Sequence, residues 1–268
     1  DQNIAHIVNV ALKFPLEERR SYFSEGIKQD DFLCIGVDGC RGGWIAAVIT
    51  KGELKIENYE TIEDIVKKYD SFNELLIDMP IGFPSNQDDI RPDTMARKIV
   101  SPRTSTIFPV PSRSAVYAVL KEDQIKRNKK SIGKGLSEQS LAIIPKMREL
   151  DVFLQEHTEY KNVIKESHPE LCFARLNGSV VMSKKSNDDG LEERLSILRR
   201  YLPQLSKSMI LKESKELRCN RDDIIDAICL AVTGRLSTLR KTESIPEKPS
   251  KDSTGLMMQM VIPKVDLS

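Results

Sequence analysis

Three acidic residues in apolar surroundings are the part of this sequence best suited to chemistry. Asp38 and Asp78 each end an apolar run, and Asp226 lies inside an apolar segment, three residues after Asp223. Carboxylates in such places are costly unless a cation lies between them. Two or three converging carboxylates are what a divalent-metal phosphoryl-transfer site needs. We therefore expect Asp38, Asp78 and Asp226 to bind Mg or Mn, with Asp223 as a further catalytic candidate.

Each of these acids also has a structural interpretation. Asp38 could form a turn before a glycine, and Asp78 could end a strand and hydrogen-bond to the loop that follows. Asp223 falls in the first turn of a predicted helix, where the helix dipole favours acids and Asn220 can be the cap. Asp226 lies a turn further in, where no cap explains it. Because Asp223 and Asp226 share a helix face, either or both could reach one metal.

A fourth acid and several cations could complete such a site. Glu166, which ends a short predicted strand, or Glu170 could be the fourth acid. His168 between them could orient a water or a leaving group, although a lone histidine before proline is more often structural. Arginine forks to phosphate oxygens and lysine acts as a point charge. Solvated loop positions are the alternative for the cations in this set. The phosphate-binding candidates are Arg41, Arg97, Arg103, Arg113, Lys184 and Lys185.

Hydrophobic periodicity predicts the elements that position these residues. The alternation and the turn residues of 32–59 indicate an antiparallel meander of three strands. The segment at about 85–135 is rich in Pro, Ser, Thr and Arg, lacks clean periodicity and is expected to be an insert. The other predicted elements are a helix from Thr61, a buried strand at 74–78, a helix at 137–155, a strand at 163–166, and helices at about 190–201 and 221–240.

This order of elements predicts an α/β fold of the ribonuclease-H-like class. We expect a mixed five-stranded sheet, made of the meander plus parallel strands, flanked by helices and carrying inserted helical or loop segments. Residues 32–268 would form this single domain, and 1–31 an amphipathic helical arm before it. The architecture brings together the ends of the first and fourth strands and the last helix, which carry the three acids.

The overall composition says less about function than these motifs do. The 268 residues include 41 basic and 40 acidic side chains, so nucleic acid is a possible partner only through a local basic patch. Five cysteines without a C-x-x-C pair suggest reduced thiols of a cytoplasmic protein. The sequence has no apolar run of 18 residues and no secretory leader pattern, so we expect no membrane association.

Several motifs in the right order resemble the family called domain of unknown function 429. The resemblance covers about 33–263 and implies a predicted nuclease with the ribonuclease H fold; for the activity, that is an analogy. The motifs are Val37–Trp44, Asp78–Pro84, Arg91–Arg97, Phe108–Arg113, Glu166–Glu170, Ser183–Lys185, Asp222–Ala227 and Asp252–Leu256.

Three functions are compatible with these patterns. The leading one is a metal-dependent nuclease or phosphodiester hydrolase of ribonuclease H type, acting on DNA, RNA, a hybrid or a junction. The second is a non-catalytic nucleic-acid- or protein-binding module on the same fold. The third is a phosphate- or nucleotide-handling enzyme of the actin and sugar-kinase kind, which needs two such halves where this chain has room for one. Convergence of the three acids would favour the first.

Overall fold

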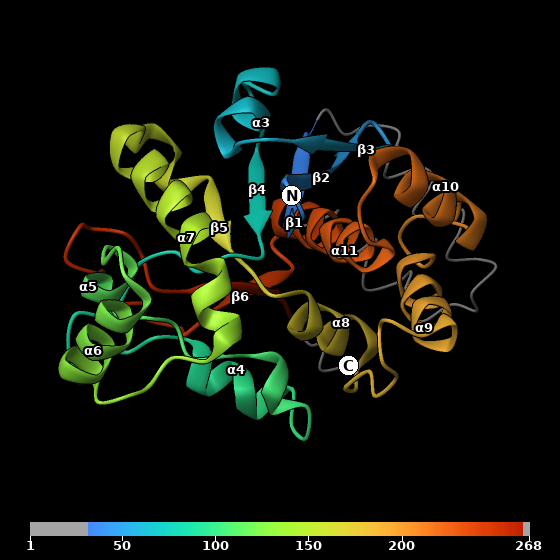
Figure 1. The fold of residues 1–268 in the computed structure, drawn as a ribbon. Helices are drawn as coiled ribbons and strands as arrows, with labels where there is room; N and C mark the ends of the chain where they lie inside the picture. Colours follow the sequence, from blue (N-terminus) through green and yellow to red (C-terminus); the bar gives the residue numbers. More distant parts are fainter. Residues whose placement is uncertain (1–31, 265–268) are drawn as a thin grey trace.

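The structure is a computed structural model in which residues 32–264 are described. The predicted arm at 1–31 lies outside these residues. The described chain is an α/β fold around a mixed five-stranded sheet of order β3-β2-β1-β4-β5 (Figure 1). Its strands are β1 (Cys34–Cys40), β2 (Gly43–Thr50), β3 (Glu53–Tyr59), β4 (Glu74–Ile77) and β5 (Ile164–Glu166).

The register of the sheet aligns the ends of its central strands. β1, β2 and β3 form the predicted antiparallel meander, while β4 and β5 continue the sheet in parallel with β1. Val37 pairs with Ile77, and Ile77 pairs with Glu166. The residues that follow these pairs therefore meet at one edge of the sheet, the edge where the parallel strands end.

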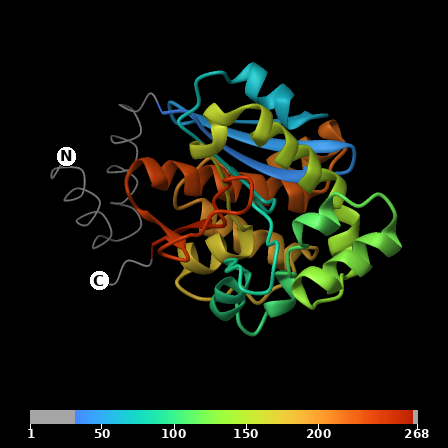
Figure 2. The same ribbon diagram turned by 90° about the vertical axis from the view of Figure 1, so that its left-hand side faces the viewer.

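Helices cover both faces of the sheet. Side chains such as Ile35 and Val37 point to one face, where they pack with α3 (Ile62–Lys68) and α7 (Glu138–Glu156). The alternate positions point to the other face, which α11 (Arg221–Thr238) covers. Figure 2 shows α3 and α7 above the strands and α11 below them. Strand alternation therefore decides which helix each residue of β1 and β4 meets.

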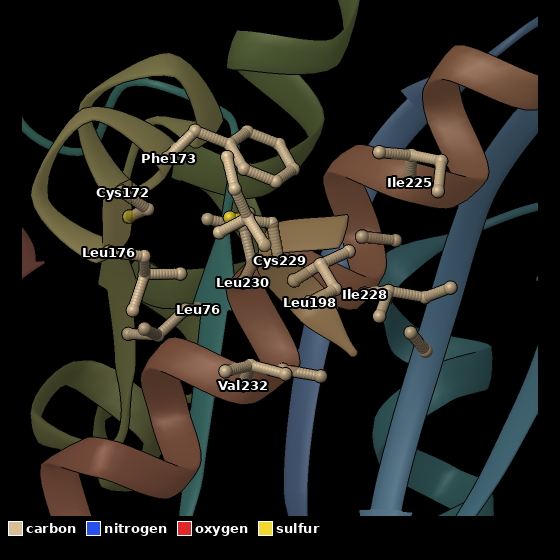
Figure 3. Close-up of a cluster of buried hydrophobic side chains, with 14 of the residues drawn as sticks. Leu76, Cys172, Phe173, Leu176, Leu198, Ile225, Ile228, Cys229, Leu230 and Val232 are labelled. Carbon is tan, nitrogen blue, oxygen red and sulfur yellow. The ribbon is translucent and has the colours of Figure 1, made fainter. Parts of the chain in front are cut away.

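Helix α11 is the centre of the second core. Leu76 of β4 packs there with α8 (Pro169–Asn177) and α9 (Asp188–Leu198), as Figure 3 shows. A Cβ at Gly36 would lie 2.1 Å from the carbonyl oxygen of Ala227. Only glycine permits so close an approach of β1 to α11, and this approach fixes the depth of the helix against the sheet.

The insert contains more regular structure than its sequence pattern indicates. It includes a 12-residue helix, α6, that apolar periodicity did not reveal, because its buried side includes Gln124 and Asn128 beside Ile132. The helical elements of the insert are α4 (Asp93–Ile99), η1 (Thr104–Thr106), α5 (Arg113–Val116) and α6 (Lys121–Ile132).

Other elements were not anticipated from the sequence. They are η2 (Thr158–Asn162), α8, α10 (Lys207–Leu217) and a hairpin of β6 (Thr242–Ile245) with β7 (Met260–Pro263). The five cysteines are free thiols, as expected. Within 32–264 no helix is both long and apolar enough to cross a bilayer.

Candidate acidic site at the carboxyl edge of the sheet

Asp38 and Asp78 lie side by side where two parallel strands end. Their predecessors Val37 and Ile77 are register partners, and the Asp78 N–H donates to the Val37 carbonyl oxygen at 2.9 Å. Alternation turns both carboxylates to the α11 face, because Val37 and Ile77 belong to the opposite core. Strand pairing alone therefore brings these two acids together.

Asp226 reaches the same place from α11. It lies in the second turn of the helix, next to Ala227, whose carbonyl approaches Gly36 of β1. Its side chain is 1% exposed, and one of its oxygens, Oδ1, is buried without a hydrogen-bond partner in the described chain. A buried carboxylate oxygen without a partner is energetically unfavourable. The three acids of the predicted metal set are thus neighbours.

The electrostatics of the cluster reflect this crowding. Burial, together with the nearby charges of Asp78 and Asp226, raises the pKa of Asp38 well above its usual value, and Lys185 opposes the rise. Burial and Asp226 also raise the pKa of Asp78, against the opposing effects of His168 and Lys185. Like charges at close range disfavour joint ionisation, so the cluster attracts a cation.

Lys185 provides a cation beside the cluster. Its ammonium lies 2.5 Å from Asp226 Oδ2, and its side chain remains 41% exposed. Burial alone would lower the pKa of Lys185, but Asp226, Asp38 and Asp78 raise it. The sequence suggested Lys185 as a phosphate-binding candidate. The structure places it in contact with an acid of the cluster, between the carboxylates and solvent.

The loop that carries Lys185 is held by a buried ion network that the sequence analysis missed. Arg194 is fully buried, donates to Glu170 Oε1 at 2.7 Å and contacts the Ser183 carbonyl oxygen at 3.2 Å. Arg103 donates to Glu170 Oε2 at 2.9 Å and to the Val181 carbonyl oxygen at 2.6 Å. No local pattern distinguishes these arginines from exposed ones. Only the fold shows that both bind one carboxylate.

Asp223 and Asn220 form the capping box that the sequence suggested. The Asp223 carboxylate accepts from the Asn220 backbone N–H at 3.3 Å and from its amide nitrogen at 3.1 Å. Burial, opposed by these hydrogen bonds, raises the pKa of Asp223. Asp223 is half-buried one turn from Asp226. It therefore lies at the rim of the cluster, where its position is explained by helix capping.

The structure does not bring Glu166 to this cluster. Its neighbour in register, Ile77, points to the α7 face, and Glu166 lies on that face too. There its carboxylate accepts from Arg91 at 2.6 Å and from the Ile81 N–H at 2.8 Å. Burial raises the pKa of Glu166 to about 7, with Arg91 opposing the rise. This ion pair fixes the loop after β4, on the wrong face of the sheet for a fourth metal ligand.

The remaining candidates are dispersed. Arg113 forks to both oxygens of Asp151, at 2.8 and 2.9 Å, which makes it a link between the insert and α7. Arg97 lines a hollow of about 110 Å³ in the insert and donates to the Thr104 carbonyl oxygen at 3.2 Å. None of the three clustered acids lines that hollow. Arg113 and Arg97 are therefore not part of the acidic site.

His168 and Arg41 lie nearer. His168 is close enough to Asp78 to lower the pKa of that carboxyl, and its Nε2 is 3.3 Å from the Thr106 carbonyl oxygen. Its Nδ1 is buried without a partner in the described chain. Arg41 is exposed in the turn between β1 and β2, three residues after Asp38. His168 therefore borders the acidic site, whereas Arg41 is near it only in sequence.

Residues 32–264 contain no group of three or more His, Cys, Asp or Glu side chains arranged to hold a metal ion.

The family whose description reads "protein of unknown function (DUF429)" matches residues 36–251. That span contains the three clustered acids and Lys185. Comparison with curated proteins and with solved structures gave no match.

Proposed function

The chain belongs to the DUF429 family, and we propose that it is a metal-dependent nuclease, a phosphodiester hydrolase with a ribonuclease-H-like fold. One observation carries the proposal: Asp38, Asp78 and Asp226 meet on one face of the sheet, where burial and mutual repulsion raise the pKa of the first two. The element order supports the fold, since a three-strand meander, a helix and a parallel strand precede the helix that carries Asp226.

The donor types suit a hard divalent cation. Because no group within residues 32–264 is arranged to hold a metal ion, Asp38, Asp78 and Asp226 would have to move closer together on binding one. Three ionised carboxylates carry three negative charges, of which the ammonium of Lys185 balances one. Mg and Mn prefer carboxylate oxygens, and Asp226 Oδ1 is a buried oxygen without a partner in the described chain. Asp38, Asp78 and Asp226 would hold the ion. A bound ion lowers the pKa of a water nucleophile and stabilises the leaving oxygen.

The ammonium of Lys185 would occupy two positions, one without substrate and one with substrate bound. The loop that carries Lys185 is held by Arg194 and Arg103, but the side chain itself is 41% exposed. It neutralises Asp226 when the site is empty. With substrate present, we expect its ammonium to turn outward and contact a phosphate oxygen as a point charge. His168, beside Asp78, would orient a water molecule.

The direct test combines metal titration with cleavage. Mn²⁺ is titrated calorimetrically into the wild type and into the double variant Asp38→Asn/Asp78→Asn, followed by cleavage of labelled single strands, duplexes, hybrids and junctions. We expect binding to the wild type alone. Activity should fall about 1,000-fold in Asp38→Asn, equal to about 4 kcal/mol of transition-state stabilisation. The matched control is Asp70→Asn/Asp88→Asn, which neutralises two exposed acids.

Two outcomes would contradict the proposal. A fully active, metal-dependent Asp38→Asn variant would remove the site from the reaction. Nucleic-acid binding by a wild type that shows no cleavage with Mg²⁺ or Mn²⁺ would favour the non-catalytic module instead. Circular dichroism of each variant ensures that a loss of activity is not a loss of fold.

A further inference from the structure

We propose that the exposed basic face of α6 binds the phosphate backbone of a nucleic acid. This basic face consists of Lys126, Arg127, Lys129, Lys130 and, just after the helix, Lys134. The basic face could bind several kinds of polyanion. We choose nucleic acid because of the proposed nuclease function, and to that extent the inference rests on the proposed function. The surface itself is defined by the geometry and charge of the insert.

Helical geometry places the cations together. At 3.6 residues per turn, the four cations inside α6 span an arc of about 160°. The buried residues Gln124, Asn128 and Ile132 occupy the opposite side of the helix. All five cations are exposed. They therefore form one continuous surface and are not scattered around the helix.

No ion pair compensates the charge of this surface within the described chain, although the first-turn acids Glu122 and Asp123 lie four residues before Lys126 and Arg127. Residues 124–137 contain these five basic side chains and no acidic one, in a chain whose totals are 41 basic and 40 acidic. Within the described chain no salt bridge joins any of the five to a carboxylate. Elsewhere Lys67 lies 2.8 Å from Glu63, and Lys121 lies 2.8 Å from Glu138. Uncompensated cations concentrated on one face favour a polyanionic partner.

Helix energetics alone do not account for the pattern. Cations near a helix C-terminus are stabilised by its dipole, which explains Lys129 and Lys130 in the last turn. Lys126 and Arg127 lie before that turn. They follow Glu122 and Asp123 by four residues, a favourable spacing, but no salt bridge within the described chain joins either pair. Lys126 and Lys130 are also four residues apart, a spacing at which like charges repel. A surface that retains this repulsion is better explained by a partner that neutralises it.

The helix is held firmly from behind. Its buried Asn128 accepts from the Ser112 N–H at 2.7 Å and donates to the Lys134 carbonyl oxygen at 2.8 Å. Gln124 donates to the Ala118 carbonyl oxygen at 3.0 Å. Because its buried side chains include these amides, α6 lacks an apolar period, but the hydrogen bonds fix which side of the helix faces the protein. The cations are thereby presented outward on a rigid support, which reduces the entropy lost on binding.

The position of α6 suits a substrate that extends beyond the acidic site. Figure 1 shows α6 in the group of insert helices on the side to which the β4 arrow points. Asp38 and Asp78 lie at that edge but on the α11 face, whereas the insert is joined to α7 through Arg113 and Asp151. Exposed Val119 and Leu120 precede the helix, and basic and apolar residues together can also bind an anionic membrane. Binding to anionic lipid vesicles is therefore measured as well.

Binding is measured in EDTA, so that no cleavage occurs. The probes are a fluorescein-labelled 30-nucleotide DNA strand, the RNA of the same sequence and the 30-base-pair duplex. The test variant is Lys126→Gln/Arg127→Gln/Lys129→Gln/Lys130→Gln. The matched control is Lys55→Gln/Lys67→Gln/Lys212→Gln/Lys215→Gln, which removes four exposed positive charges from other elements. Affinity for each probe is measured from 50 to 200 mM salt.

We expect the test variant to bind at least one probe about tenfold or more weakly than the control variant. Its plot of log affinity against log salt should flatten by about 0.7 per lost contact for a single strand, or about 0.9 for a duplex. Equal loss in both variants, no binding by the wild type, or binding only to vesicles of phosphatidylserine would each overturn the inference. Binding through this face without any Mg²⁺- or Mn²⁺-dependent cleavage would uphold it and contradict the proposed nuclease.

Discussion

Two buried carboxylate sites lie at the same edge of one sheet, and they differ in how many cations and hydrogen-bond donors contact their carboxylate oxygens. On the α7 face, each oxygen of Glu166 has a donor, from Arg91 at 2.6 Å and from Ile81 at 2.8 Å. On the α11 face, Asp38, Asp78 and Asp226 crowd together, and Lys185 contacts one oxygen of Asp226. Both oxygens of Glu166 are therefore satisfied, although Oδ1 of the neighbouring Asp93 has no partner in the described chain. The second site holds three carboxyl groups beside one ammonium.

The difference separates a site built for stability from one that can bind a cation. An ion pair whose members are fully bonded holds the loop after β4 and has no capacity for a further ligand. A cluster with raised carboxyl pKa values and a buried oxygen without a partner is less stable than it could be. Such strain is common where residues are retained for function.

The largest expected effect is on stability at the Arg91–Glu166 pair. Glu166→Gln removes the nearer counter-charge of a buried guanidinium and leaves only Asp93, 3.3 Å from Arg91 Nε. We expect a loss of about 3 kcal/mol in the free energy of unfolding. The matched substitution Asp38→Asn should leave stability unchanged or slightly higher, because it relieves repulsion. Urea denaturation of both variants measures the contrast. A similar loss in the two would remove the distinction between the sites.

A smaller effect is expected when the cation of the acidic cluster is removed. Lys185→Met leaves Asp226 buried beside two other acids, and we expect a loss of about 1–3 kcal/mol at neutral pH. The exposed neighbour Lys184 provides the control as Lys184→Met, which should change stability by less than about 0.5 kcal/mol. Saturating Mn²⁺ should restore part of the loss in Lys185→Met. No restoration by metal would weaken the proposed metal site.

The smallest effect is a difference in pH dependence. The raised pKa values of Asp38 and Asp78 mean that the folded state binds more protons than the unfolded state above the ordinary carboxyl pKa of about 3.9. Wild-type stability should therefore fall as pH rises from about 4, until both groups are ionised. Urea titrations in EDTA should show a flatter profile for Asp38→Asn/Asp78→Asn. Parallel profiles would mean that the cluster is not strained.

Where the sequence predictions failed, the residues show why. Helix α6 buries amides, so the apolar period that reveals a helix is missing. The β6–β7 hairpin packs against the α11 core through Met260 and Val261, a contact between segments distant from the sheet in sequence. The meander and α7 could be predicted because each buries a regular apolar face, and β4 and α11 because each is a nearly continuous apolar run.

By itself, the sequence determined that Asp38 and Asp78 would end apolar runs and that Asp226 would lie inside an apolar helix, because burial of those elements is encoded in local hydrophobic patterns. It could not determine that Glu166 points to the other face, since one residue of register reverses the direction of a strand side chain. Nor could it show that Arg194, Arg103 and Glu170 clamp the loop of Lys185. Those contacts join segments distant in the chain, and only the tertiary structure brings their charges within bonding distance.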